Sequence, residues 1–146
     1  MKNGNKHPQM LEGIEIRNLV TVEFPYGLPG FEWLKRFNIA EVKDNPLFSL
    51  LYSTDEPDIS MIIMKCPVAE TSEELYKLVR KEIKRYFGAN GNGVDIYFVV
   101  RLEKGEKKLI ANYSAPIVVC RDRMVGYQLI LERDLSELIC ENSNVR

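Results

Sequence analysis

The chain has 146 residues and a formal net charge of −1, with 45% hydrophobic and 28% charged residues. These values are typical of one globular domain with an ordinary core, and they argue against a dedicated nucleic-acid-binding domain, which usually carries a clear basic excess. No apolar run approaches the roughly 20 residues that cross a bilayer.

The first ten residues are polar and lack the apolar centre of a signal peptide. We therefore expect a cytoplasmic protein with a flexible leader at 1–10, a single domain at 11–140 and a flexible tail at 141–146. The cysteines are widely spaced and odd in number, at Cys66, Cys120 and Cys140. Buried free thiols are the expected state of such residues.

Residues 14–24 alternate between apolar and polar side chains, which predicts a strand with one wet face. Asn18 interrupts the apolar phase, so the pattern fits one bent strand or two. Residues 25–30 then hold two prolines and two glycines. Because proline fixes φ and glycine allows positive φ, this composition predicts a stiff, defined bend. The spacing of Phe31, Leu34 and Phe37 suggests a helical turn after it.

Further short apolar runs are separated by polar turns, a pattern typical of an antiparallel sandwich or barrel. The expected strands cover residues 48–53, 59–65, 95–102, 108–113, 116–120 and 127–132. The run at 95–102 is apolar on both phases, so we expect it to be buried on both faces. The predicted fold is a mainly β, small antiparallel barrel-like domain with one amphipathic helix.

That helix is expected at 71–87, where one helical face carries the apolar residues Leu75, Leu78, Val79, Ile83, Tyr86 and Phe87. Thr71 and Glu74 have the spacing of a capping box, and Gly88 can end the helix. The other face carries Lys77, Arg80, Lys81, Lys84 and Arg85. A solvated surface is the ordinary explanation of such a face, and contact with an acidic protein or an RNA is the sharper one. A short helix at 134–139 is also predicted.

No pattern of catalytic residues emerges from the chain. The only histidine, His7, lies in the leader, and the glycine-rich stretch at 88–93 follows a helix and precedes a strand, the reverse of a phosphate-binding loop. We therefore expect no enzyme activity, no cofactor and no metal. Catalysis by carboxylates on a small barrel is kept as an alternative, because aspartate and glutamate are plentiful.

Two stretches resemble a known family. Residues 24–32 read F-P-Y-G-L-P-G-F-E and are similar to the F-P-x-G-I/L-P-G-F-E signature of FliW, the bacterial flagellar assembly factor. Residues 112–118, with Asn112 and the A-P-I-V run, resemble a second family segment, N-x-x-A-P-I-V-I-N. Shorter likenesses occur at 51–58, at Pro67 and at 126–131, in the family's order.

The resemblance implies a small β-barrel-like domain and a non-enzymatic cytoplasmic role. FliW proteins bind newly made flagellin and the translational regulator CsrA, and they relieve the repression of flagellin synthesis when flagellin is exported. The implied mechanism is partner exchange, in which flagellin and CsrA compete for the protein. No membrane and no direct nucleic-acid contact are expected.

The same resemblance suggests partner-binding residues: Phe31, Glu32, Asn112 and Gln128. Phe31 has an alternative role as a core residue beneath the bend. Asn112 and Gln128 could equally satisfy neighbouring backbone groups. An RNA-binding module that uses the basic helix face is the remaining alternative function.

Three positions depart from the family pattern and put the nearby partner contacts in doubt. The family glutamine before serine is Tyr52 here, the asparagine that closes the A-P-I-V segment is Cys120, and a lysine before the late glutamine is Tyr127. The basic helix also differs from the acidic, irregular segment expected at that place in the family.

Overall fold

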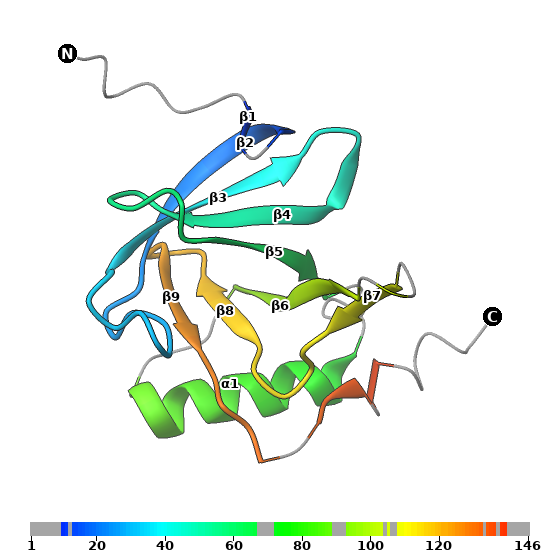
Figure 1. Cartoon of the computed structure of the whole chain (residues 1–146). Helices are drawn as coiled ribbons and strands as arrows, with labels where there is room; N and C mark the ends of the chain where they lie inside the picture. The colour runs from blue at the N-terminus through cyan, green and yellow to red at the C-terminus, as the bar shows by residue number, and fades with distance from the viewer. Residues whose placement is uncertain are drawn as a thin grey trace.

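The computed structural model describes residues 10–11, 13–66, 72–88, 93–103, 105, 108–132, 134–136 and 138–139. Within these residues the chain forms a β-rich domain with a single long helix (Figure 1). The elements are β1 (Met10–Leu11), β2 (Ile14–Glu23), β3 (Arg36–Val42), β4 (Asn45–Ser53), β5 (Ser60–Lys65), α1 (Glu73–Phe87), β6 (Val94–Glu103), β7 (Lys108–Ala111), β8 (Ile117–Cys120) and β9 (Val125–Gln128). No helix in this part of the chain is long and apolar enough to cross a membrane.

The strands close into a barrel. Their order is β1-β2-β3-β4-β5-β6-β8-β9, and the parallel pairing of Glu23 in β2 with Val125 in β9 joins the two ends. Every other strand pair is antiparallel. Closure leaves few unpaired edges, which protects a β protein from edge-to-edge association. The predicted mainly β, barrel-like fold is confirmed.

Strand β6 is fully buried on the face that carries Ile96 and Phe98 and half-buried on the face that carries Tyr97 and Val99, so the predicted burial of both faces holds in part. Tyr97 and Val99 pack inside the barrel with Ile117 and Val119 of β8. Alternate residues pack on the outside against helix α1, which lies across β6, β8 and β9 (Figure 1). This outer cluster includes Ile96, Phe98, Val118, Cys120, Tyr127 and Leu129 of the sheet with Leu75, Val79 and Ile83 of the helix.

Strand β2 is one bent strand. The register with β3 shifts between Arg17 and Val20, and Asn18 has a φ of 55°. This bulge inserts one extra residue into β2. Side chains two, four or six positions apart therefore lie on opposite faces of the sheet when the bulge stands between them. Ile16 accordingly packs with Ala40 on the outside of the sheet, whereas Val22 packs inside the barrel.

The two ends of the barrel differ in chemistry. At one end, Phe24, Leu28 and Leu34 come from the segment between β2 and β3 and pack into the interior. At the other end, the inward positions become polar and line a pocket of about 400 Å³. Its polar lining includes Asn18, Glu41, Ser49, Lys65, Asp95, Tyr97 and Arg121.

Two element predictions are wrong. The helical turn expected at 31–37 is only one turn long, and in it the Leu34 amide donates to the Phe31 carbonyl at 3.0 Å. Phe37 already belongs to strand β3. Sequence reading missed β3 because its residues are buried almost without alternation. The last strand, expected at 127–132, is β9 and ends at Gln128. Leu129 and Leu131 still donate backbone hydrogen bonds to the loop before β8.

Helix α1 confirms the predicted helix, with one correction at its start. The N-terminal cap is Ser72, whose hydroxyl accepts a hydrogen bond of 3.3 Å from the Leu75 amide. Thr71, the predicted cap, lies outside the described residues. Gly88 ends the helix at a φ of 64°, as expected. Tyr86, assigned from the sequence to the apolar face, is 52% exposed.

Most of the predicted leader and tail lie outside the described residues, although β1 already begins at Met10. Cys66 and Cys120 are buried and neither forms a disulfide, as expected, and burial raises the pKa of Cys120. Cys140 is not among the described residues. Near the end of the described chain, the Ile139 amide donates to the Leu135 carbonyl at 3.2 Å, which forms a helical turn in the predicted place.

Candidate functional site

The proline- and glycine-rich segment at 24–34 folds as three successive turns. The amides of Gly27, Phe31 and Leu34 donate to the carbonyls three residues earlier, at 2.9, 2.7 and 3.0 Å. In the middle turn, Pro29 is followed by Gly30 at a φ of 90°, the arrangement that a type II turn requires. The predicted stiff bend is therefore present, and its ends are joined by the Phe24 amide and the Lys35 carbonyl at 2.7 Å.

Gly27 lies where this segment crosses itself. Its φ is 65°, and a Cβ atom placed there would lie 2.7 Å from the Glu32 Cα and 2.8 Å from the Phe31 carbonyl oxygen. Real Cβ atoms do not approach backbone so closely. Only glycine therefore permits residues 31 and 32 to pack against the first turn.

At this crossing, Phe31 and Glu32 differ in how far their side chains are buried. Phe31 is half-buried and packs against the cluster inside the barrel. Its position is therefore nearer to the alternative prediction, in which Phe31 is a core residue. Glu32 is exposed, and its carboxylate accepts a hydrogen bond of 3.0 Å from the Gly30 amide. This backbone hydrogen bond lowers the pKa of Glu32, because it favours the charged carboxylate.

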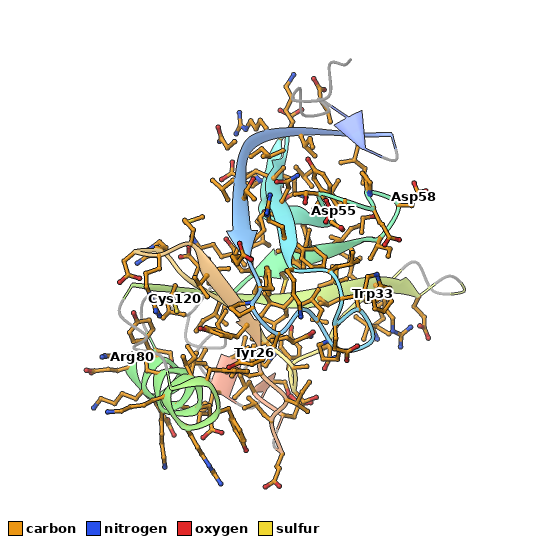
Figure 2. All side chains as sticks on the ribbon, turned by 90° about the vertical axis from the view of Figure 1, so that its left-hand side faces the viewer. Tyr26, Trp33, Asp55, Asp58, Arg80 and Cys120 are labelled. Carbon is orange, nitrogen blue, oxygen red and sulfur yellow. The ribbon has the colours of Figure 1, made fainter. Side chains whose placement is uncertain are left out.

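Two large aromatic side chains project from the same segment (Figure 2). Tyr26 is 60% exposed and Trp33 is 62% exposed. The Trp33 indole Nε1 donates to the Glu56 carboxylate at 3.2 Å, and its ring lies 5.8 Å from that of Phe31. We call the surface formed by Tyr26, Pro29, Phe31, Glu32 and Trp33 the aromatic corner.

Tyr26 joins the aromatic corner to helix α1. Its ring lies 5.4 Å from Phe87, the last residue of the helix, and 6.2 Å from Tyr127. Phe87 and Tyr127 stack on each other with centroids 4.3 Å apart. These three rings, with Gly27, Pro29, Glu32 and Gln128, line a shallow pocket of about 120 Å³.

The structure brings together only some of the predicted partner-binding residues. Glu32 and Gln128 line the same pocket, whereas Phe31 packs against the cluster inside the barrel. The Gln128 amide nitrogen also donates to the Ala115 carbonyl at 3.0 Å. Asn112 does not line this pocket, and its side-chain oxygen accepts from the Ser114 amide at 3.2 Å. Both amide side chains therefore satisfy neighbouring backbone groups.

Sequence reasoning missed Tyr26 and Trp33, although both lie in or next to the family-like segment. Large aromatic side chains are usually buried, so the sequence alone does not indicate that these two are exposed. The available signal was the density of turns: a chain that reverses three times in eleven residues cannot bury every side chain.

The three substituted positions of the family pattern are buried. Tyr52 and Cys120 are 2% and 0% exposed, and Tyr127 is 7% exposed beneath the aromatic pocket. Burial raises the pKa of Tyr52 and of Tyr127. These substitutions therefore change internal packing more than the surface that a partner meets.

The polar end of the barrel is the larger cavity. Asp95 lies between two cations there, with Lys65 Nζ at 3.8 Å and a short hydrogen bond from Arg121. Glu41 lies 3.8 Å from Arg17 Nε and accepts a hydrogen bond from Asn18. Burial, with the charges of Asp95 and Glu41, raises the pKa of Tyr97 to about 12. Both carboxylates are thus engaged by basic or amide partners.

Comparisons with known proteins identify the family. A sequence model of the FliW protein family matches residues 6–139. The flagellar assembly factor FliW of Clostridium tetani (strain Massachusetts / E88) is 29% identical over 92% of this chain and 90% of its own length. That of Clostridium botulinum (strain Langeland / NCTC 10281 / Type F) is 31% identical over 83% and 84%.

A crystal structure of the flagellar assembly factor FliW has the same fold, with a TM-score of 0.60 and 24% identity over 77% of this chain and 78% of that one. The family match spans the barrel, the aromatic corner and helix α1, so that the sequence and the fold agree. The chain belongs to the FliW protein family.

Proposed function

We propose that this protein is a cytoplasmic flagellar assembly factor that binds flagellin and antagonises the translational regulator CsrA by partner exchange. The observation that carries the proposal is the aromatic corner. It lies on the segment that most resembles the family signature, and it exposes two large aromatic side chains on a stiff backbone.

The physical chemistry of the aromatic corner suits protein binding. Tryptophan and tyrosine are the residues that most often dominate protein interfaces, because they bury much apolar area and retain a polar group. Tyr26 rests on Phe87, and Trp33 is tied to Glu56 by its hydrogen bond. Side chains that are already ordered lose less entropy on binding, so such a surface favours affinity.

The same reasoning supports a single shared site for exchange. If flagellin occupies the aromatic corner, a second protein that needs the same aromatic side chains is excluded, and the two affinities become linked. Free flagellin then holds the protein away from CsrA, and loss of flagellin releases it. Mutual exclusion is the specific prediction of this arrangement.

The alternative of a carboxylate-based enzyme receives no specific support from the polar pocket. That pocket contains Glu41 and Asp95, but each is paired with a cation of the protein itself. A general acid or base needs a carboxylate aimed at a substrate position. We therefore keep protein binding as the proposed function.

Calorimetric titration of the purified protein with flagellin and, separately, with CsrA tests the proposal. We expect binding to each partner, and we expect preloading with flagellin to abolish the CsrA signal. Binding to neither partner by the folded protein contradicts the proposed function. Binding of both partners at once contradicts the exchange mechanism alone.

A matched pair of variants tests the role of the aromatic corner. The double variant Y26A/W33A removes the two exposed aromatics, and we expect it to weaken flagellin binding by at least about tenfold, as interface hot spots do. The control L47A/L109A removes two apolar residues that are 41% and 51% exposed on other elements. Equal losses of flagellin affinity in both variants would show that the aromatic corner is not the flagellin-binding surface.

A further inference from the structure

Helix α1 exposes a row of five cations on one of its faces. We call Lys77, Arg80, Lys81, Lys84 and Arg85 the basic stripe. All five are exposed, and their spacing of three and four residues places them on one helical face. The only carboxylate within the span is Glu82, which is 9% exposed, so the outer face of the helix between 77 and 85 is entirely cationic.

Intramolecular contacts explain only part of this row. Lys84 and Arg85 lie in the last turn, where cations stabilise the helix dipole. Lys77 and Lys81 lie further from that end. Among the described residues, no carboxylate lies within 4.0 Å of Lys77, Lys81, Lys84 or Arg85. The ion pairs found there join residues of the barrel strands and of the turns after β3 and β8.

Two tyrosines hold the arginines of the basic stripe in place. The guanidinium carbon of Arg80 lies 5.7 Å from the ring centre of Tyr76, and that of Arg85 lies 5.3 Å from the ring centre of Tyr86. Both distances fall within the range of cation–π contacts. The contacts restrict the guanidinium groups while their charge remains directed at solvent, as Figure 2 shows for Arg80.

The size and surroundings of the basic stripe favour a compact acidic partner. At 1.5 Å per residue the stripe is about 12 Å long. The chain carries a formal net charge of −1, so without these five cations the rest of it carries −6. A long polyanion such as RNA would extend past the stripe over a protein whose remaining net charge is negative, whereas a short acidic segment would remain on the stripe.

We propose that the basic stripe binds an acidic helical segment of a protein partner. Carboxylates spaced three and four residues apart on such a segment would face the cations of the stripe, as charged flanking residues do in paired helices. In Figure 2 Tyr26 lies between Arg80 and Trp33, and the ring contact of Tyr26 with helix α1 is made by Phe87, which is not a member of the basic stripe. The proposal does not depend on the proposed function.

The test uses a defined probe. A fluorescent, end-capped alanine-based peptide carries five glutamates at spacings of three and four, and its twin carries five glutamines. We expect the full-length protein to bind the glutamate peptide at low ionic strength, with affinity that falls as salt is added, and not to bind the twin. Amide chemical-shift changes should be confined to residues 73–88.

Matched charge variants locate the binding. K77Q/K81Q/K84Q should weaken peptide binding by at least about tenfold, while K35Q/R36Q/K108Q, which removes the same net charge from exposed positions elsewhere, should change it less than about twofold. Equal losses in the two variants, or no binding by the wild type, overturn the proposal. So does tighter binding of polyuridylate RNA through the same lysines, or self-association of the protein that requires them.

Discussion

The aromatic corner and helix α1 touch through Tyr26 and Phe87, yet they are specified in different ways. The corner depends on single residues, because each turn needs a particular backbone angle and Gly27 has no room for a side chain. The helix depends on periodicity, because Leu75, Val79 and Ile83 face the barrel at regular spacing.

This difference determines how freely each surface can vary. In the aromatic corner, the residues that set the backbone and those that meet solvent alternate within eleven positions, so most substitutions disturb both. On the helix, the outer face is separate from the packed face, so most of its charges can change at little cost to the fold. The exposed side chains differ accordingly: the corner exposes aromatics and Glu32, and the helix exposes mainly charged residues.

The sharpest test of this comparison replaces one glycine from each region. Gly27 and Gly88 have nearly equal φ values of 65° and 64°, but only Gly27 is crowded, since nothing lies within 4 Å of a Cβ at Gly88. We expect Gly27→Ala to lower the free energy of unfolding by about 3 kcal/mol or more, and Gly88→Ala by about 1 kcal/mol. Urea denaturation measures both, and equal values would mean that the crossing at Gly27 is not rigid.

The stacked rings between the two regions give the next largest effect. Phe87→Ala removes the ring that stacks on Tyr127 at 4.3 Å and supports Tyr26, so we expect a loss of about 2 kcal/mol. The adjacent Tyr86 is 52% exposed, and Tyr86→Ala should cost less than about 0.5 kcal/mol. Thermal unfolding of both variants measures the difference. Similar melting temperatures would show that the stack contributes little.

A smaller effect is expected at the start of the helix. Ser72→Ala removes the hydroxyl that accepts from the Leu75 amide, and the loss should be about 1 kcal/mol, the usual value of an N-terminal cap. Ser72→Asp restores an acceptor and should recover most of the stability. If the aspartate variant is as unstable as the alanine variant, the hydroxyl acts through packing instead.

The smallest effect concerns the charge of Glu32. Its pKa in the folded protein is lowered by the Gly30 amide, so the carboxylate stabilises the fold above its ordinary pKa of 4.5, and this contribution is lost as pH falls through the lowered value. Glu32→Gln should remove this contribution, so the free energy of unfolding should fall slightly near neutral pH and change little below the lowered pKa. Stability curves between pH 3 and pH 7 measure it, and identical curves for both proteins would contradict the assignment.

The sequence alone predicts the helix, the barrel-like fold and the stiff bend, because each has a local cause in periodicity or in proline and glycine chemistry. It does not predict β3, whose consecutive buried residues show no alternation. It also fails where distant segments meet: the stacking of Phe87 on Tyr127 and the position of Tyr26 above them depend on barrel closure. Glu32 and Gln128 share a pocket for the same reason, whereas Asn112 only closes its own turn.

Hydrogen exchange of the protein with and without saturating flagellin locates the partner contact without a substitution. We expect added protection of backbone amides at 24–35 and at 125–131, with little change along the exposed face of helix α1. Flagellin binding that leaves 24–35 unchanged and protects another surface would contradict the aromatic corner as the partner site.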